Sequence, residues 1–149
     1  MNYADSFAIS AIGMNIERAR VDVAALNLAN ANTVQGAGGQ SYQPLRVIAQ
    51  VRDDARFGTM VGRGLDSAGS MAQLTPSMQV VATQGASRMV YEPSHPLANA
   101  QGFVAYAAVD PATEMVSMMS ATRAYEANVS AMNTARTLAL RALDIGSGA

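Results

Sequence analysis

The sequence predicts an α+β, mainly helical fold, in which long N- and C-terminal helices pair as an antiparallel coiled coil beside a small, irregular, β-rich middle module. Nine of the twelve glycines and four of the five prolines lie within residues 36–102, whereas residues 1–33 hold one glycine and no proline. Apolar residues recur at alternating spacings of three and four in both terminal segments, which is typical of paired helices. We therefore divide the chain into an N-terminal helical arm (1–33), a middle module (34–109) and a C-terminal helical arm (110–149).

The N-terminal arm carries a seam of seven positions, six of them apolar: Ile9, Ile12, Ile16, Ala19, Val23, Leu26 and Asn30. The polar residues around its end, Asn30, Asn32 and Thr33, are natural capping and turn residues. They predict that the first helix ends there.

The middle module combines strand-like runs with turn residues. Residues 42–52 and 77–84 contain strand-like runs, and we expect residues 88–93 and 102–109 to form either short strands or extended segments. Residues 53–75 contain four glycines and show no sustained periodicity. We expect a long loop there, exposed or in contact with a partner.

The C-terminal arm has a clear helix start. Asp110 suits the N-cap, Pro111 the first helical position, and Glu114 the first turn, where the helix dipole favours an anion. Gly146 is the predicted stop. The seam of this arm runs over nine positions, with Thr122 and Arg136 as polar exceptions: Met115, Met118, Thr122, Tyr125, Val129, Met132, Arg136, Ala139 and Leu143.

Large apolar residues also lie outside both seams, although a two-helix coil covers only one stripe on each helix. They are Phe7, Val21, Leu28, Val116, Met119, Leu138 and Leu140. We expect these residues either to cover the middle module or to contact other subunits.

Composition argues against several functions. The net charge is −1 and lysine is absent, so no basic patch indicates nucleic-acid binding. The absence of cysteine removes disulfides, thiol catalysis and sulfur-ligated zinc. No apolar run is long enough for a membrane span. The N-terminus does not resemble a cleaved secretory signal, which by itself favours a cytoplasmic protein.

No arrangement of residues indicates an enzyme, a cofactor or a metal. The single histidine, His95, stands between Pro93 and Pro96, and a turn residue explains it better than a general base or ligand does. Met115, Met118 and Met119 could suggest copper, but their seam spacing favours residues that fill the core.

Two terminal segments resemble a known family. "LNLANANT" (26–33) is similar to the N-terminal signature of the bacterial flagellar axial proteins of the rod and hook, and "EMVSMMSATRAYEANVSAMNTARTLALRALDIG" (114–146) is similar to their C-terminal signature. The segment "MVYEPSHPLANAQGFVAYAAVDPATEMV" (89–116) resembles the proximal-rod members of that family. The resemblance is weakest over residues 36–88.

The resemblance implies a structural subunit that stacks helically in the rod, the drive shaft crossing the periplasm, with its terminal helices around the export channel. Implied partners are further copies, other proximal rod proteins, the rod adaptor FliE, the distal rod and the flagellar type III export apparatus, which exports its substrates without a cleaved signal. We expect assembly contacts at Ile9, Ile12, Ile16, Val23, Leu26, Asn27, Asn30, Asn32, Thr33, Met118, Tyr125, Asn128, Val129, Met132 and Leu143.

Two other functions stay open from the sequence. One is a different axial subunit of the rod or hook. The other is a cytoplasmic helical-hairpin adaptor that binds a partner helix. Concentration-dependent self-polymerisation would argue against the adaptor.

Overall fold

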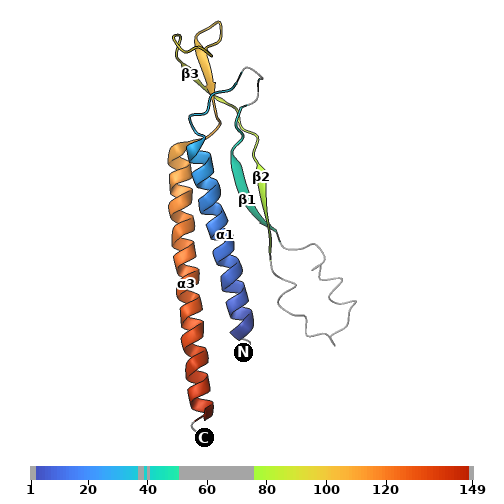
Figure 1. Cartoon of the computed structure of the whole chain (residues 1–149), viewed down its shortest axis with the longest axis vertical. Coiled ribbons are helices and arrows are strands. Elements are labelled where there is room, and N and C mark those ends of the chain that lie inside the picture. The colour runs from blue at the N-terminus through green and yellow to red at the C-terminus, as the bar shows by residue number, and fades with distance from the viewer. Residues whose placement is uncertain (1–2, 37–38, 40, 51–75, 148–149) are drawn as a thin grey trace, which may run out of the picture. The chain divides into compact units, whose positions relative to one another are not determined.

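The computed structural model describes residues 3–36, 39, 41–50 and 76–147. Its elements follow the chain in the order α1 (Tyr3–Ala29), β1 (Leu45–Gln50), β2 (Ser77–Ala82), β3 (Arg88–Tyr91), β4 (Phe103–Tyr106) and α3 (Pro111–Ser147) (Figure 1). Each of the four predicted strand segments contains a strand, and both arms are helical. The mixed, mainly helical fold class is thus confirmed. The predicted loop 53–75 falls outside the described residues.

Helix α1 ends in a turn that its own polar side chains close. The Asn30 side-chain amide donates to the carbonyl oxygen of Leu26 at 2.9 Å, and the Thr33 hydroxyl donates to Asn30 Oδ1 at 3.3 Å. The Leu26 carbonyl oxygen also accepts the backbone N–H of Asn30 at 3.1 Å, and the Thr33 N–H donates to the Asn30 carbonyl oxygen at 3.0 Å, so side-chain and backbone bonds close this turn together. The predicted capping role of Asn30 and Thr33 is confirmed.

Helix α3 begins as predicted and ends later. Asp110 Oδ1 accepts a hydrogen bond from the Ala112 N–H at 3.2 Å, and its Oδ2 accepts one from the Thr113 hydroxyl at 2.5 Å. The predicted stop at Gly146 is wrong, because α3 continues to Ser147. Gly146 is not among the described glycines with positive φ, so it lacks the left-handed conformation that commonly ends a helix.

The four strands form two separate two-stranded sheets. Strands β3 and β4 pair antiparallel, with Tyr91 opposite Phe103, and Val34 bridges the other edge of β4 at Tyr106. Strands β1 and β2 also run antiparallel, since Pro44 accepts a bond from Thr83 near one end of the pair while Gln50 accepts one from Ser77 near the other.

The chain divides into two compact units, and both long helices contribute to each. The helix-end unit comprises residues 1–18, 48–79 and 122–149, and the junction unit comprises residues 19–47 and 80–121. The junction unit holds the core: Val104 and Ala107 are fully buried, and Tyr42 packs against the cluster of Ala31, Ala107 and Val109.

Helices α1 and α3 pack through small residues in both units. In the junction unit Ala24 and Ala121 are almost fully buried. In the helix-end unit a Cβ added at Gly13 would lie 2.9 Å from the amide atoms of Asn128, so glycine lets the two helices approach there. No described helix is both long and apolar enough to cross a membrane.

The packed stripe differs from the predicted seams by one residue at several positions. Leu26 is 52% exposed whereas Asn27 is fully buried, and Ala121 is buried whereas Thr122 is exposed. Arg136, the second polar exception, is also exposed. One residue turns a helix by about 100°, so the same spacing of three and four fits two neighbouring faces. The predicted seam was wrong at these positions, and coiled-coil pairing in the strict sense stays a prediction.

Candidate assembly interface

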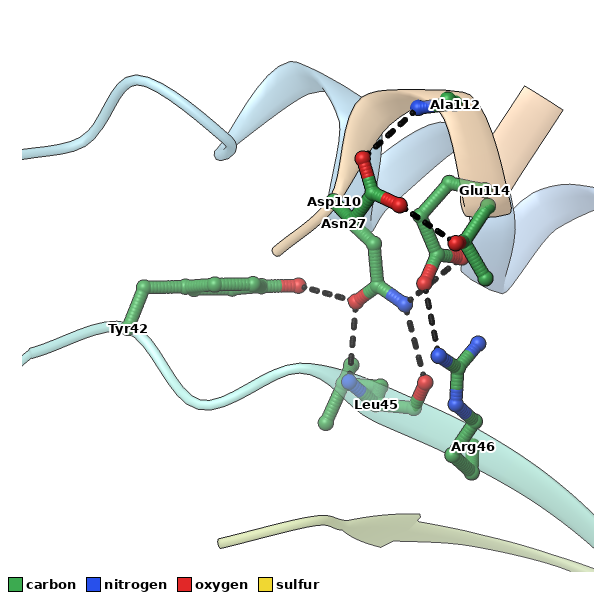
Figure 2. A network of polar contacts seen from close by, with 8 residues as sticks. Asn27, Tyr42, Leu45, Arg46, Asp110, Ala112 and Glu114 are labelled. Carbon is green, nitrogen blue, oxygen red and sulfur yellow. Dashed lines mark hydrogen bonds and ion pairs between the residues drawn. The ribbon is translucent and has the colours of Figure 1, made fainter. Parts of the chain in front are cut away.

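Asn27 is the centre of a polar junction between α1, β1 and α3 (Figure 2). Its Oδ1 accepts hydrogen bonds from the Leu45 N–H at 2.8 Å and from the Tyr42 hydroxyl at 2.9 Å. Its Nδ2 donates to the Leu45 carbonyl oxygen at 2.9 Å and to Glu114 Oε2 at 3.2 Å. One fully buried amide therefore uses both its donors and its acceptor to hold three segments together.

Glu114 is the second buried polar residue of this junction, with 1% of its surface exposed. Its Oε1 lies 2.8 Å from Arg46 Nη2, and the Arg46 side chain remains 43% exposed. A buried carboxylate is tolerated only when it is paired and hydrogen-bonded. The ion pair from β1 and the amide from α1 meet this condition.

Two titratable groups next to this pair have shifted pKa values. Burial, with a smaller contribution from the Glu114 carboxylate, raises the pKa of the Tyr42 phenol above its ordinary value of 10.0. The Thr113 hydroxyl, followed by the Ala112 N–H, lowers the pKa of the Asp110 carboxyl. At neutral pH, Tyr42 is thus a hydrogen-bond donor and Asp110 an ionised helix cap.

Sequence reasoning found only part of this junction. It named Asn27 as a contact residue and Glu114 as a partner of the helix dipole, but it did not single out Tyr42, Leu45 or Arg46. A signal for Glu114 was present, because Glu114 precedes the packed residues Met118 and Ala121 at helical spacing. An acidic residue on an apolar stripe requires a partner.

The predicted contact residues occupy different environments. Val23 and Asn27 are buried, and seven are half-buried: Ile12, Ile16, Asn30, Met118, Asn128, Val129 and Met132. Six are exposed: Ile9, Leu26, Asn32, Thr33, Tyr125 and Leu143. The structure brings Asn27 into the junction and Asn128 against Gly13, where its amide also donates to the Ala124 carbonyl oxygen at 3.0 Å. Contacts of these residues with other subunits remain a prediction.

Helix α3 exposes much of its apolar surface. The exposed large hydrophobic residues are Met115, Val116, Met119, Tyr125, Leu138, Leu140, Leu143 and Ile145, and Ile145 reaches 79%. Met115 and Met119 therefore do not fill the core of the chain, contrary to prediction, because they point away from the stripe that meets α1. These residues include one group in the junction unit (115–119) and one in the helix-end unit (138–145), and exposed apolar groups of this kind are candidates for contact with other subunits.

The last turns of α3 have no part of α1 opposite them. Within the helix-end unit, Gly13 faces Asn128 and the helices run antiparallel (Figure 1). Helix α1 begins at Tyr3, ten residues before Gly13, which places its start opposite Leu138, ten residues after Asn128. Leu140, Leu143 and Ile145 consequently lie beyond α1.

No described arrangement resembles a catalytic or metal site. His95 closes a turn, since its Nδ1 accepts a hydrogen bond from the Leu97 N–H at 3.1 Å and its own N–H donates to the Glu92 carbonyl oxygen at 3.1 Å. The described residues contain no group of three or more His, Cys, Asp or Glu placed to hold a metal ion. The predicted local role of His95 is confirmed.

Comparison with known proteins shows which family this chain belongs to. A family model described as the C-terminal part of the flagellar basal body rod proteins FlgEFG matches residues 100–145. The flagellar basal-body rod protein FlgC of Salmonella typhimurium is 39% identical over 94% of this chain and 95% of its own length. The chain belongs to the FlgC family of flagellar basal-body rod proteins. FlgC of Yersinia enterocolitica is 35% identical over 98% of the chain and 99% of its own length, and FlgC of Bacillus subtilis is 33% identical over 95% and 96%.

Family membership makes the chain a structural subunit of the flagellar basal-body rod and not an enzyme. Its place is the basal body, where it assembles with other rod components.

Proposed function

We propose that the chain forms the proximal part of the rod, polymerising helically with copies of itself and with other rod proteins into the drive shaft that encloses the export channel. The observation that carries this proposal is the apolar surface of α3, which the chain leaves exposed at eight large hydrophobic residues. Contacts that join two different surfaces generate open helical filaments when the rotation between copies does not close a ring, and subunits of such a filament contact several neighbours.

The junction around Asn27 and Glu114 supports the same role. A subunit that transmits torque has to keep its strands and its helices together under load. Four hydrogen bonds to one buried amide and a buried ion pair tie α1, β1 and the first turn of α3 to each other. The network is internal, so it leaves the outer apolar surfaces available for contacts with neighbours.

The same proposal includes specific partners within the flagellum. FliE-type adaptor protein and the distal rod are the neighbours at the two ends of the proximal rod, and the flagellar type III apparatus exports the chain without removing a leader. The rod then crosses the periplasm.

An in-frame deletion of the gene tests the function. We expect cells without flagella and without motility, because later parts of the flagellum assemble on the rod, and we expect the wild-type gene to restore both. An epitope-tagged chain should label purified basal bodies at the rod. Peptide mass spectrometry of those basal bodies should recover the N-terminal peptide uncleaved. Normal filaments in the deletion strain would contradict the proposal.

A further inference from the structure

The β3–β4 hairpin of the junction unit has one face whose large side chains are partly exposed. Tyr91 and Phe103 are cross-strand partners, and Met89 lies two residues before Tyr91, so the three side chains share this face. They are 64%, 39% and 52% exposed, respectively. Val104, whose side chain points to the opposite face, is fully buried. The hairpin thus has a packed side and an open apolar side.

The charged residues of the hairpin are both directed to its packed side. The Arg88 guanidinium lies 5.4 Å from the centre of the Tyr106 ring, and the Tyr106 hydroxyl donates to Glu92 Oε2 at 3.1 Å. Arg88 lies opposite Tyr106 on the neighbouring strand, and Glu92 is an even number of residues after Arg88, so all three side chains lie on the same side of the hairpin. The opposite side of the hairpin, which we call the Tyr91 face (Met89, Tyr91 and Phe103), therefore carries no charge.

The Tyr91 face is held in one geometry although it is exposed. The rings of Tyr91 and Phe103 meet edge to face, with centroids 5.3 Å apart at 64°. Gly102 has φ +80°, and a Cβ there would lie 2.8 Å from Cε2 of Tyr91. Glycine thus leaves room for the ring against the backbone. Aromatic groups fixed in this way lose little conformational entropy when a partner covers them.

We propose that the Tyr91 face packs on the C-terminal end of α3 in a second copy of the chain. This inference rests on the proposed self-assembly. Arg141 and Asp144 are three residues apart and share one side of that helix end, while Leu138, Leu140, Leu143 and Ile145 occupy the other sides and are 52–79% exposed. A helix that is apolar on nearly all sides is normally enclosed. Each copy thus carries an uncharged apolar face on the hairpin and a largely apolar helix end whose charged residues lie on one side. A contact between these two different surfaces is head to tail, and it extends into a filament when the rotation between copies does not close a ring.

The size of the Tyr91 face favours a copy in a polymer over a soluble partner. Aromatic side chains bury about 150–250 Å² each, so three partly exposed side chains contribute roughly 300 Å². A stable two-protein interface needs about 800 Å² from each partner. The Tyr91 face alone is too small to hold a dimer, but it can act together with the other contacts of a polymer.

Disulfide cross-linking tests the contact, because the chain has no native cysteine. Cells carrying Tyr91→Cys and Leu143→Cys together should yield, after mild oxidation, disulfide-linked dimers and higher multiples that neither single variant yields. Adding Phe103→Ser should reduce the linked fraction severalfold, whereas Met78→Ser, an exposed methionine on β2, should not. If the double-cysteine strain is motile but yields only unlinked or internally linked monomer, the proposed contact is wrong. Motility of that strain would show that the rod function still holds.

A photoreactive benzoylphenylalanine at position 91 covers the case in which the double variant does not assemble. Cross-linked peptides should join position 91 to residues 138–145 of another copy, recognised by mixing isotopically heavy and light chains. Cross-links that join position 91 to a different protein, or to other parts of a second copy, would overturn the proposal.

Discussion

Replacing Asn27 by alanine should destabilise the junction unit more than any other change of similar size. The side chain is fully buried and makes four hydrogen bonds, two with the backbone of Leu45, one with the Tyr42 hydroxyl and one with the Glu114 carboxylate. Asn27→Ala removes all four. It also leaves the polar groups of the other three residues without this hydrogen-bond partner, because an alanine methyl group can neither donate nor accept a hydrogen bond.

The expected loss follows from the kinds of bond removed. A neutral hydrogen bond contributes about 1 kcal/mol net and one to a charged group about 1.5–3 kcal/mol. Water can reach part of the site through the half-exposed Arg46, which offsets some of the loss. We therefore expect the free energy of unfolding to fall by about 3–5 kcal/mol, a large share of the roughly 5–15 kcal/mol that stabilises a typical domain.

Urea unfolding followed by far-ultraviolet circular dichroism measures this loss on the full chain. Asn32→Ala is the matched control, since Asn32 is exposed in the same segment and should change the free energy by no more than about 0.5 kcal/mol. An Asn27→Ala variant within about 0.5 kcal/mol of wild type would refute the reasoning. It would mean that the junction does not bind β1 to the helices in solution.

The pKa of Tyr42 is raised in the folded state, so the stabilisation that Tyr42 provides is complete below its unfolded pKa near 10.0 and is lost as the pH rises through its folded pKa. In urea unfolding at a series of pH values, Tyr42→Phe should therefore reduce the fall in the free energy of unfolding at alkaline pH. Gly102→Ala should lower the free energy of unfolding by about 1–3 kcal/mol because of its positive φ. Gly36→Ala, where the added Cβ would meet no atom within 4 Å, should be nearly neutral in the same assay. Ile16→Asp should abolish rod assembly and motility through a charge on the half-buried side of α1, and a motile strain would show that this side is not packed. In monomeric protein, hydrogen exchange should be slower for the amides of the junction unit than for those of the helix-end unit, and equal protection would mean that α1 and α3 complete their packing without neighbours.

Local chemistry made much of the fold predictable. The dipeptide Asp110–Pro111 marked the start of α3, because a carboxylate cap and a residue without an N–H both suit a helix N-terminus. Asn30 and Thr33 marked the end of α1 through bonds within one turn. The strands lay where β-branched and aromatic residues cluster. Each of these features depends on residues a few positions apart, and such spacing is visible in a sequence.

The tertiary structure alone decided which sides of the helices meet and what Glu114 does. A spacing of three and four suited a stripe through Leu26 and Thr122 as well as one through Asn27 and Ala121, and long-range contacts selected the second. The sequence identified the family and the excess of apolar surface on the last helix. It could not show that Asn27 and Glu114, 87 residues apart, share a hydrogen bond. The physical reason is that a buried polar residue is stabilised by its partners, and those partners are brought to it by the folding of distant segments.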